Sequence, residues 1–142
     1  MALIGGGGAG NVAGGNPSGT GTSLNYILNR VYAYSGSVPI TNEIKDMLIF
    51  NTGSELIEAN VNFSNTTESL SSGTRTGMII KFNSEIILDC NWIFSNNTNY
   101  QYALQPIPLI IPPYTAVIIQ GQSSDDDAID FNAIVTGRII DA

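Results

Sequence analysis

The sequence contains no histidine and only one cysteine, Cys90. Without histidine, the chain cannot form a Ser-His-Asp or Cys-His catalytic arrangement, and it lacks the commonest metal ligand in proteins. One thiol cannot form an internal disulfide, and one cysteine without histidine cannot complete a zinc site. We therefore expect no catalytic residues, no cofactor and no well-defined metal centre, and we interpret Cys90 as a small buried apolar side chain.

Charged residues are also scarce, at 12% of the chain, and only five residues are lysine or arginine. The formal net charge of −7 argues against direct contact with nucleic acid, because so few cations cannot neutralise a row of phosphates. The same few cations cannot form a basic patch on anionic lipid, and no apolar run is long enough to span a membrane. A polar surface with so little charge favours a protein packed among neighbouring subunits.

The start of the chain is rich in glycine instead. Residues 1–23 combine glycine with alanine, asparagine, serine and threonine. They lack the basic and apolar regions of a signal peptide, so we expect no classical secretion. Such a segment buries too little apolar surface to offset its loss of entropy, so it should be flexible alone and ordered only on a partner surface. A disordered linker is the alternative interpretation.

Extended at about 3.3 Å per residue, this N-terminal arm would reach roughly 75 Å, enough to cross a neighbouring subunit. The arm residues that we single out as candidate assembly contacts are Gly5, Gly6, Gly7, Gly8, Asn11, Gly14, Gly15, Asn16, Pro17, Gly19 and Gly21. They do not form a nucleotide-binding loop, because no Gly-Lys-Ser/Thr follows to hold phosphate and magnesium.

Residues 24–142 are predicted to form one domain, an all-β, antiparallel, jelly-roll-like β-sandwich. About eight short apolar segments recur at regular spacing, with almost no helical periodicity. Residues 57–63 alternate strictly, so 57, 59, 61 and 63 should face the core. Strands are also expected at 31–36, 47–50, 77–82, 85–90, 109–111, 115–121 and 133–140, while residues 23–30 fit a short helix or an ordered lead into the first strand.

Turn signals punctuate these segments. Asn83-Ser84 is predicted to form a two-residue hairpin turn, and Pro112-Pro113 should end a strand at an edge of a sheet because proline has no backbone donor. The polar stretch 64–76 is expected to be a long loop.

An acidic run, Asp125-Asp126-Asp127 with Asp130 nearby, is the candidate cation site. Crowded carboxylates can bind Ca²⁺, but the spacing is not that of a helix–loop–helix calcium site, so a solvated loop before the last strand is the favoured interpretation. Glu55, Glu58 and Glu85 alternate with apolar residues and should face solvent, which gives no paired carboxylates for glycoside hydrolysis.

Aromatic residues could serve recognition. Flat amphipathic rings line both glycan sites and protein interfaces, although strand residues of this kind more often lie in the core or form cross-strand pairs. The residues concerned are Tyr32, Tyr34, Trp92, Tyr100, Tyr102 and Tyr114.

Both ends of the chain resemble small virion proteins of marine tailed bacteriophages. The resemblance rests on residues 11–27 with Tyr32-Ala33-Tyr34-Ser35-Gly36, on Ile111-Pro112-Pro113-Tyr114, and on Val135-Thr136-Gly137-Arg138-Ile139-Ile140; the middle is only generically β. It implies a location in the virion and a structural role, that of decorating or cementing the capsid surface beside other capsid subunits. It transfers no active-site residue.

Three functions therefore compete. The first is a homo-oligomeric virion protein anchored through its arm. The second is a tail-fibre or receptor-binding module that contacts a host glycan. The third is a self-polymerising fibre subunit whose arm completes a neighbour's sheet, although the arm has too few β-formers to make a good donor strand. An enzyme is the weakest option.

Overall fold

The computed structural model describes residues 24–65, 75–93, 106–124, 126 and 128–140. Every regular element in this part of the chain is a β-strand, which confirms the predicted all-β class. The strands are β1 (Asn25–Ile27), β2 (Arg30–Tyr34), β3 (Val38–Ile40), β4 (Lys45–Asn51), β5 (Leu56–Asn65), β6 (Arg75–Phe82), β7 (Glu85–Ile93), β8 (Ile107–Ile111), β9 (Ala116–Ser123) and β10 (Ile129–Ile140).

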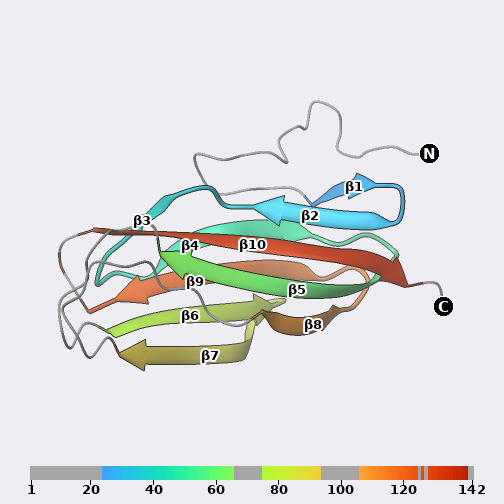
Figure 1. The fold of residues 1–142 in the computed structure, drawn as a ribbon. Coiled ribbons are helices and arrows are strands. Elements are labelled where there is room, and N and C mark those ends of the chain that lie inside the picture. The colour runs from blue at the N-terminus through green and yellow to red at the C-terminus, as the bar shows by residue number, and fades with distance from the viewer. Residues whose placement is uncertain (1–23, 66–74, 94–105, 125, 127, 141–142) are drawn as a thin grey trace.

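The strands form two antiparallel sheets that pack face to face (Figure 1). The six-stranded sheet has the order β1-β2-β10-β5-β8, with β3 pairing the same edge of β10 as β2, and the four-stranded sheet has the order β4-β9-β6-β7. From β3 onward the chain changes sheet at every connection except the β6–β7 hairpin. This alternation is the jelly-roll pattern, so the predicted sandwich is confirmed at the level of topology.

The core lies between the two sheets and follows the strand period of two. Alternate residues of β5 (Ile57, Ala59, Val61 and Phe63) are all buried, as predicted. The rings of Phe63 and Phe131, on neighbouring strands, stack with their centroids 4.8 Å apart. The long central strand β10 thus joins the two halves of the six-stranded sheet and supplies the middle of the core.

The break between β2 and β3 is closed by a side chain. Ser35 is fully buried; its backbone amide donates to the Ala133 carbonyl at 3.0 Å, and its hydroxyl oxygen accepts from the Ala133 amide at 2.8 Å. Gly36 follows with a φ of 71°, a conformation that favours glycine. The serine hydroxyl therefore replaces a backbone acceptor and keeps one edge of β10 paired across the break.

The structure corrects two boundaries. Residues 25–34 form a β-hairpin, so the short-helix interpretation of residues 23–30 is wrong: Ile27 and Leu28 are 59% and 93% exposed and share no buried helical face with Leu24. The last strand begins at Ile129 instead of 133, because Ile129 and Phe131 already point into the core. Asp130 consequently belongs to β10 and not to the acidic loop.

The connections divide between two ends of the sandwich (Figure 1). One end, here called the turn end, carries the short connections β1–β2, β4–β5, β6–β7 and β8–β9. The opposite loop end carries β3–β4, β5–β6, β7–β8 and β9–β10. Most of the predicted 64–76 loop, at residues 66–74, lies outside the described residues.

Candidate functional site

The eleven glycine-rich residues predicted to contact a partner lie outside the described residues, so the arm stays a prediction. The described chain begins at Leu24, which is buried, and enters the edge strand β1. Burial raises the pKa of the Tyr26 hydroxyl in β1, the Glu55 carboxylate raises it further, and a hydrogen bond to the backbone of Gly53 opposes both effects. Tyr26 of β1 therefore lies beside the β4–β5 connection at the turn end.

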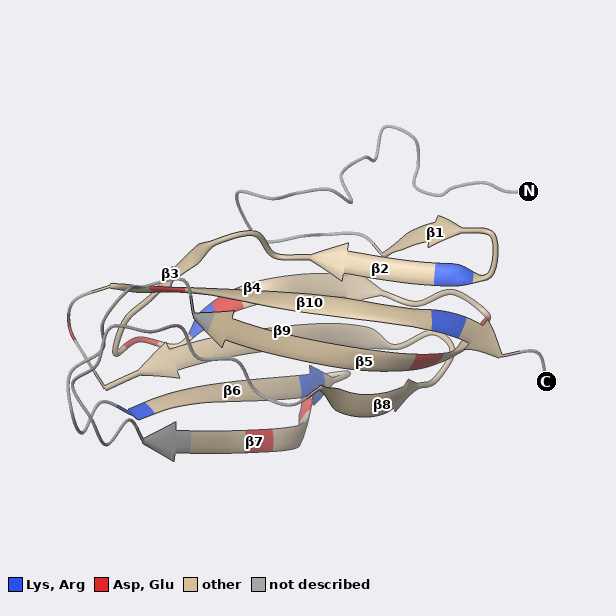
Figure 2. Cartoon of the chain, viewed as in Figure 1, with Lys and Arg blue, Asp and Glu red and all other residues tan. Residues whose placement is uncertain are grey.

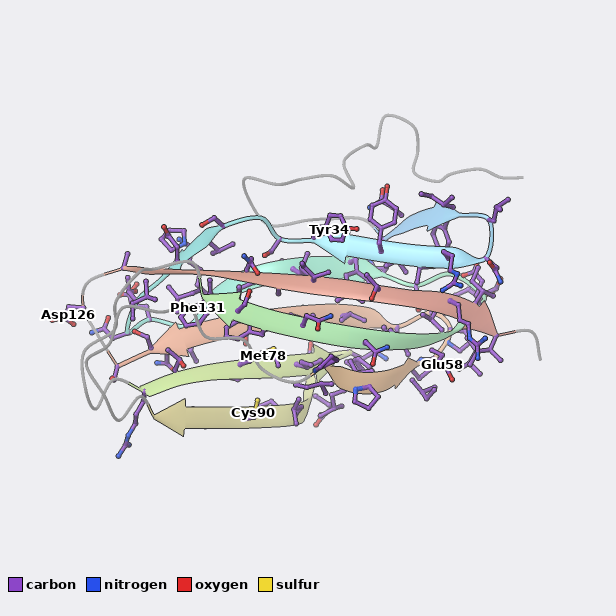
Figure 3. All side chains as sticks on the ribbon, in the orientation of Figure 1. Tyr34, Glu58, Met78, Cys90, Asp126 and Phe131 are labelled. Carbon is purple, nitrogen blue, oxygen red and sulfur yellow. The ribbon has the colours of Figure 1, made fainter. Side chains whose placement is uncertain are left out.

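The predicted cation site is only partly described, because Asp125 and Asp127 fall outside the described residues. Asp126 is exposed at the loop end (Figure 3), where its carboxylate accepts a hydrogen bond of 2.5 Å from the Asn42 side chain. Asp130 lies on β10 opposite Pro39. Within the described ranges, no three carboxylate, thiol or imidazole groups gather closely enough to hold a metal ion.

Cys90 lies on the edge strand β7 beside the core (Figure 3). Its side chain is half-buried, whereas we predicted a buried one. Burial raises the pKa of its thiol, a backbone hydrogen bond with Met78 opposes this, and the charge of Asp89 adds to it. Since the thiolate is the reactive form, a raised pKa makes this cysteine a poor nucleophile at neutral pH.

Edge strands are the natural places for another chain to pair with a sheet. The β8 edge carries Pro108 in the strand and Pro112 directly after it, which block pairing. The β7 edge has neither proline nor lysine, and Ile86 and Ile87 are 56% and 44% exposed. Among the described strands β7 pairs with β6 alone, and its exposed charged residues are Glu85 and Asp89.

The outer face of the six-stranded sheet has a hollow of about 410 Å³ over β2, β10 and β5. We call it the β2–β10–β5 hollow; besides the backbone of Val31 and Gly137, its lining residues are Arg30, Tyr32, Glu58, Asn60, Thr136 and Arg138. The strand register arranges these six side chains in two rows. Arg30, Arg138 and Glu58 form a charged row, and Tyr32, Thr136 and Asn60 form a neutral row.

In the charged row, the Arg138 guanidinium pairs with the Glu58 carboxylate at 3.0 Å, and both side chains are about half exposed. Arg30 lies directly opposite Arg138 on the neighbouring strand. Figure 2 shows this gathering of charge on β2, β10 and β5 near the turn end.

The aromatic residues take different places. Tyr32 and Tyr34 lie on the outer face with ring centroids 5.1 Å apart, so neither is a core residue. Tyr114 is 76% exposed at the turn end. The Trp92 side chain, Tyr100 and Tyr102 lie outside what the structure describes. Sequence alternation alone could have placed Arg30 with Tyr32 and Glu58 with Asn60 on outward faces, but bringing these pairs together requires the strand order.

None of the described residues belongs to a helix that is long and apolar enough to cross a membrane.

No known protein family and no curated protein matches the sequence. Solved structures do match. A chain from the T13 particle of infectious bursal disease virus aligns with a TM-score of 0.50 and 11% identity over 78% of this chain and 31% of that one. A chain of the Gt strain of the same virus aligns with a TM-score of 0.49 and 13% identity, over 77% of this chain and 33% of that one. Eiger TNF from S. frugiperda aligns with a TM-score of 0.40 and 9% identity, over 64% of this chain and 63% of that one.

This chain therefore spans about a third of the length of the viral chains it matches. At such low identity the likeness concerns the fold alone, and the first match reaches the TM-score at which a shared fold is meaningful. No sequence match connects the chain to virion proteins of marine tailed bacteriophages, so that resemblance stays a prediction. The conclusion is a β-sandwich fold of the kind found in a virus particle.

Proposed function

We propose that this chain is a structural protein of a virus particle, placed on the capsid as a decoration or cement protein and anchored through residues 1–23. The observation that carries the proposal is the jelly-roll topology, which is common in viral capsid domains and which aligns with a chain of an icosahedral virus particle. Function does not follow from fold alone, so the proposal needs further support from the chain itself.

The surface supports an assembly role. The chain has few charged residues, a net charge of −7 and no histidine. This composition offers few groups for acid–base catalysis, and we propose no enzymatic activity. The exposed β7 edge gives the domain a place to contact a neighbouring subunit or a second copy, because Ile86 and Ile87 would gain free energy from burial there.

The primary test is the protein's location. Virus particles from the source of this sequence would be purified on a density gradient, and their proteins identified by mass spectrometry. The proposal expects the chain in the particle band at a fixed ratio to the major shell protein. Its presence only in the unassembled fraction would contradict the virion role.

The arm is tested separately. A variant lacking residues 1–22 should keep the β-sandwich circular-dichroism spectrum but lose its place on particles. A second variant with the same 22 residues in shuffled order is the matched control for length and composition. Loss of binding in both variants supports a specific arm, whereas normal binding by the shuffled variant makes the arm a mere linker and removes the anchoring claim.

A receptor-binding module remains the second candidate, because the β2–β10–β5 hollow and the Tyr32–Tyr34 pair give it a definite surface. A self-polymerising fibre subunit is a weaker candidate. The β7 edge could accept a donor strand, but the glycine-rich arm has little of the alternating apolar pattern that a donor strand needs.

A further inference from the structure

We propose that the β2–β10–β5 hollow binds an acidic saccharide, a sugar that carries a carboxylate. The inference rests on the arrangement of six side chains from three strands and does not depend on the assembly role. All three strands are described over the whole hollow, so its shape and register are known.

The first argument is the placement of positive charge. The chain has only five lysine and arginine residues, yet two of them, Arg30 and Arg138, lie opposite each other on adjacent strands. Like charges directly opposite one another destabilise a sheet. Glu58 neutralises Arg138, and Arg30 makes no ion pair with another described residue. An anionic ligand group at Arg30 would relieve this repulsion.

The second argument is the kind of anion. A guanidinium presents parallel N–H donors that match a carboxylate in a bidentate pair. Glu58 stands two strands away in the same row, and it would repel a ligand with several negative charges, such as a polyphosphate. The charged row therefore suits a ligand with one carboxylate near Arg30 and hydrogen-bond donors near Glu58.

The third argument is the neutral row. Tyr32 is half-buried and lines the hollow, and its ring lies 5.1 Å from that of Tyr34, with the two ring planes at 40°. Thr136 lies between Tyr32 and Asn60, so a hydroxyl and an amide stand beside the ring. An aromatic surface with a few placed donors and acceptors is typical of small polar ligand sites. Sugar rings offer both an apolar face and hydroxyl groups.

The two rows fit one ligand together. They are two residues apart along each strand, about 7 Å, which one sugar ring with its carboxylate can span. A simple carboxylate would use only the charged row, and a neutral sugar would leave Arg30 unpaired. An acidic saccharide uses both rows at once.

The test uses the purified full chain labelled with ¹⁵N and titrated by NMR. The probes are D-glucuronate, D-glucose and the tripeptide tri-aspartate. We expect D-glucuronate to shift the amides of residues 30–32, 58–60 and 136–138 saturably, with a Kd on the order of 1 mM. D-Glucose should bind at least tenfold more weakly, and tri-aspartate should not perturb residues 32 and 60.

Arg30→Gln is the informative variant because it leaves the Arg138–Glu58 pair in place. It should weaken D-glucuronate binding about tenfold and leave the response to D-glucose unchanged. Arg75→Gln is the matched control, since Arg75 is an exposed arginine on the other sheet, and it should bind D-glucuronate like the native chain.

Three results would overturn the proposal. One is the absence of any saturable shift with D-glucuronate up to 50-fold above the expected Kd. Another is equal binding of D-glucose, which would make Arg30 irrelevant. The last is binding of tri-aspartate as tight as that of D-glucuronate, which would turn the hollow into a contact for an acidic protein segment.

Discussion

The two ends of the sandwich differ in how their connections are held. At the turn end, the β4–β5 connection is bonded to the β8–β9 connection through Thr52, which is buried: its hydroxyl donates to the Pro112 carbonyl at 2.8 Å and accepts from the Thr115 amide at 2.9 Å. At the loop end, a side-chain bond joins Asn42 to Asp126, and both residues are exposed. The β9–β10 connection is also bonded to β6, because the Ser124 amide donates to the Arg75 carbonyl at 2.8 Å and the Arg75 amide donates to the Ser124 hydroxyl at 2.9 Å.

Both ends also carry bonds between a connection and a neighbouring strand. The β6–β7 turn is fixed to β9 by two bonds, from the Asn83 amide to the Ala116 carbonyl at 2.8 Å and from the Ala116 amide to the Asn83 side chain at 2.9 Å. Buried bonds that lose a partner cost far more than exposed ones. Among the described residues, the two ends therefore differ in burial: Thr52 at the turn end is buried, whereas Asn42 and Asp126 at the loop end are exposed.

The largest effect is expected at Gly137, on β10 in the half of the sheet next to the turn end. A Cβ there would lie 2.5 Å from the Glu58 carbonyl oxygen and 2.9 Å from the Ala59 Cα, and backbone atoms cannot move aside cheaply. Gly137→Val should lower the free energy of unfolding by about 3 kcal/mol, measured by urea denaturation.

Gly53→Ala is the control for that substitution, because its Cβ would meet only the flexible end of the Glu55 side chain. It should cost less than about 1 kcal/mol. Equal losses for the two variants would mean that close approach of β5 to β10 does not determine stability.

The next effect is expected at Thr52. Thr52→Val keeps the shape of the side chain but leaves the Pro112 carbonyl and the Thr115 amide without their partner, so it should cost about 2 kcal/mol. Thr52→Ser retains the hydroxyl and should lose less than half as much in thermal and urea unfolding. Equal losses of stability for Thr52→Val and Thr52→Ser would show that the two hydrogen bonds of the Thr52 hydroxyl do not stabilise the turn end.

A gain is expected at Ser84. Asn83 and Ser84 have φ angles of 51° and 73°, the signature of a two-residue hairpin turn that favours Asn-Gly. Ser84→Gly should therefore raise the free energy of unfolding by about 0.5–1 kcal/mol. The same change at Ser37, an exposed residue without a positive φ, should lower it; a gain at both positions would contradict the strain argument.

The smallest effect is expected at the loop end. Asn42→Ala removes the exposed bond to Asp126 and should change stability by no more than about 0.5 kcal/mol. Asn25→Ala is the contrasting variant, since Asn25 is buried and donates to the Tyr32 carbonyl at 3.2 Å; it should cost about 1 kcal/mol. If Asn42→Ala proves the more damaging, burial does not decide what the loss of these side-chain bonds costs.

Much of the fold could be predicted where one local signal was sufficient. Strict alternation gave the buried face of β5, Asn83-Ser84 gave the hairpin, and Pro112 ended the edge strand β8. Residues 23–30 were misjudged because the spacing of Leu24, Ile27 and Leu28 imitates a helical turn, whereas pairing of β1 with β2 decides the structure.

The candidate site was less predictable. Ile129 and Phe131 alternate with Asp130 and Asn132, and this signal would have extended the last strand and removed Asp130 from the acidic loop. The β2–β10–β5 hollow joins residues as far apart as Arg30 and Arg138, and only the sheet order brings them together. Long-range pairing of this kind is set by the whole core and leaves no local trace in the sequence.

The virion role is tested most directly by a cryo-electron microscopy reconstruction of the virus particle. The proposal predicts density on the outside of the shell that fits the two sheets of residues 24–140, with residues 1–23 continuing from β1 into the contacts between shell subunits. A complete particle map in which every density is assigned to other proteins would contradict it.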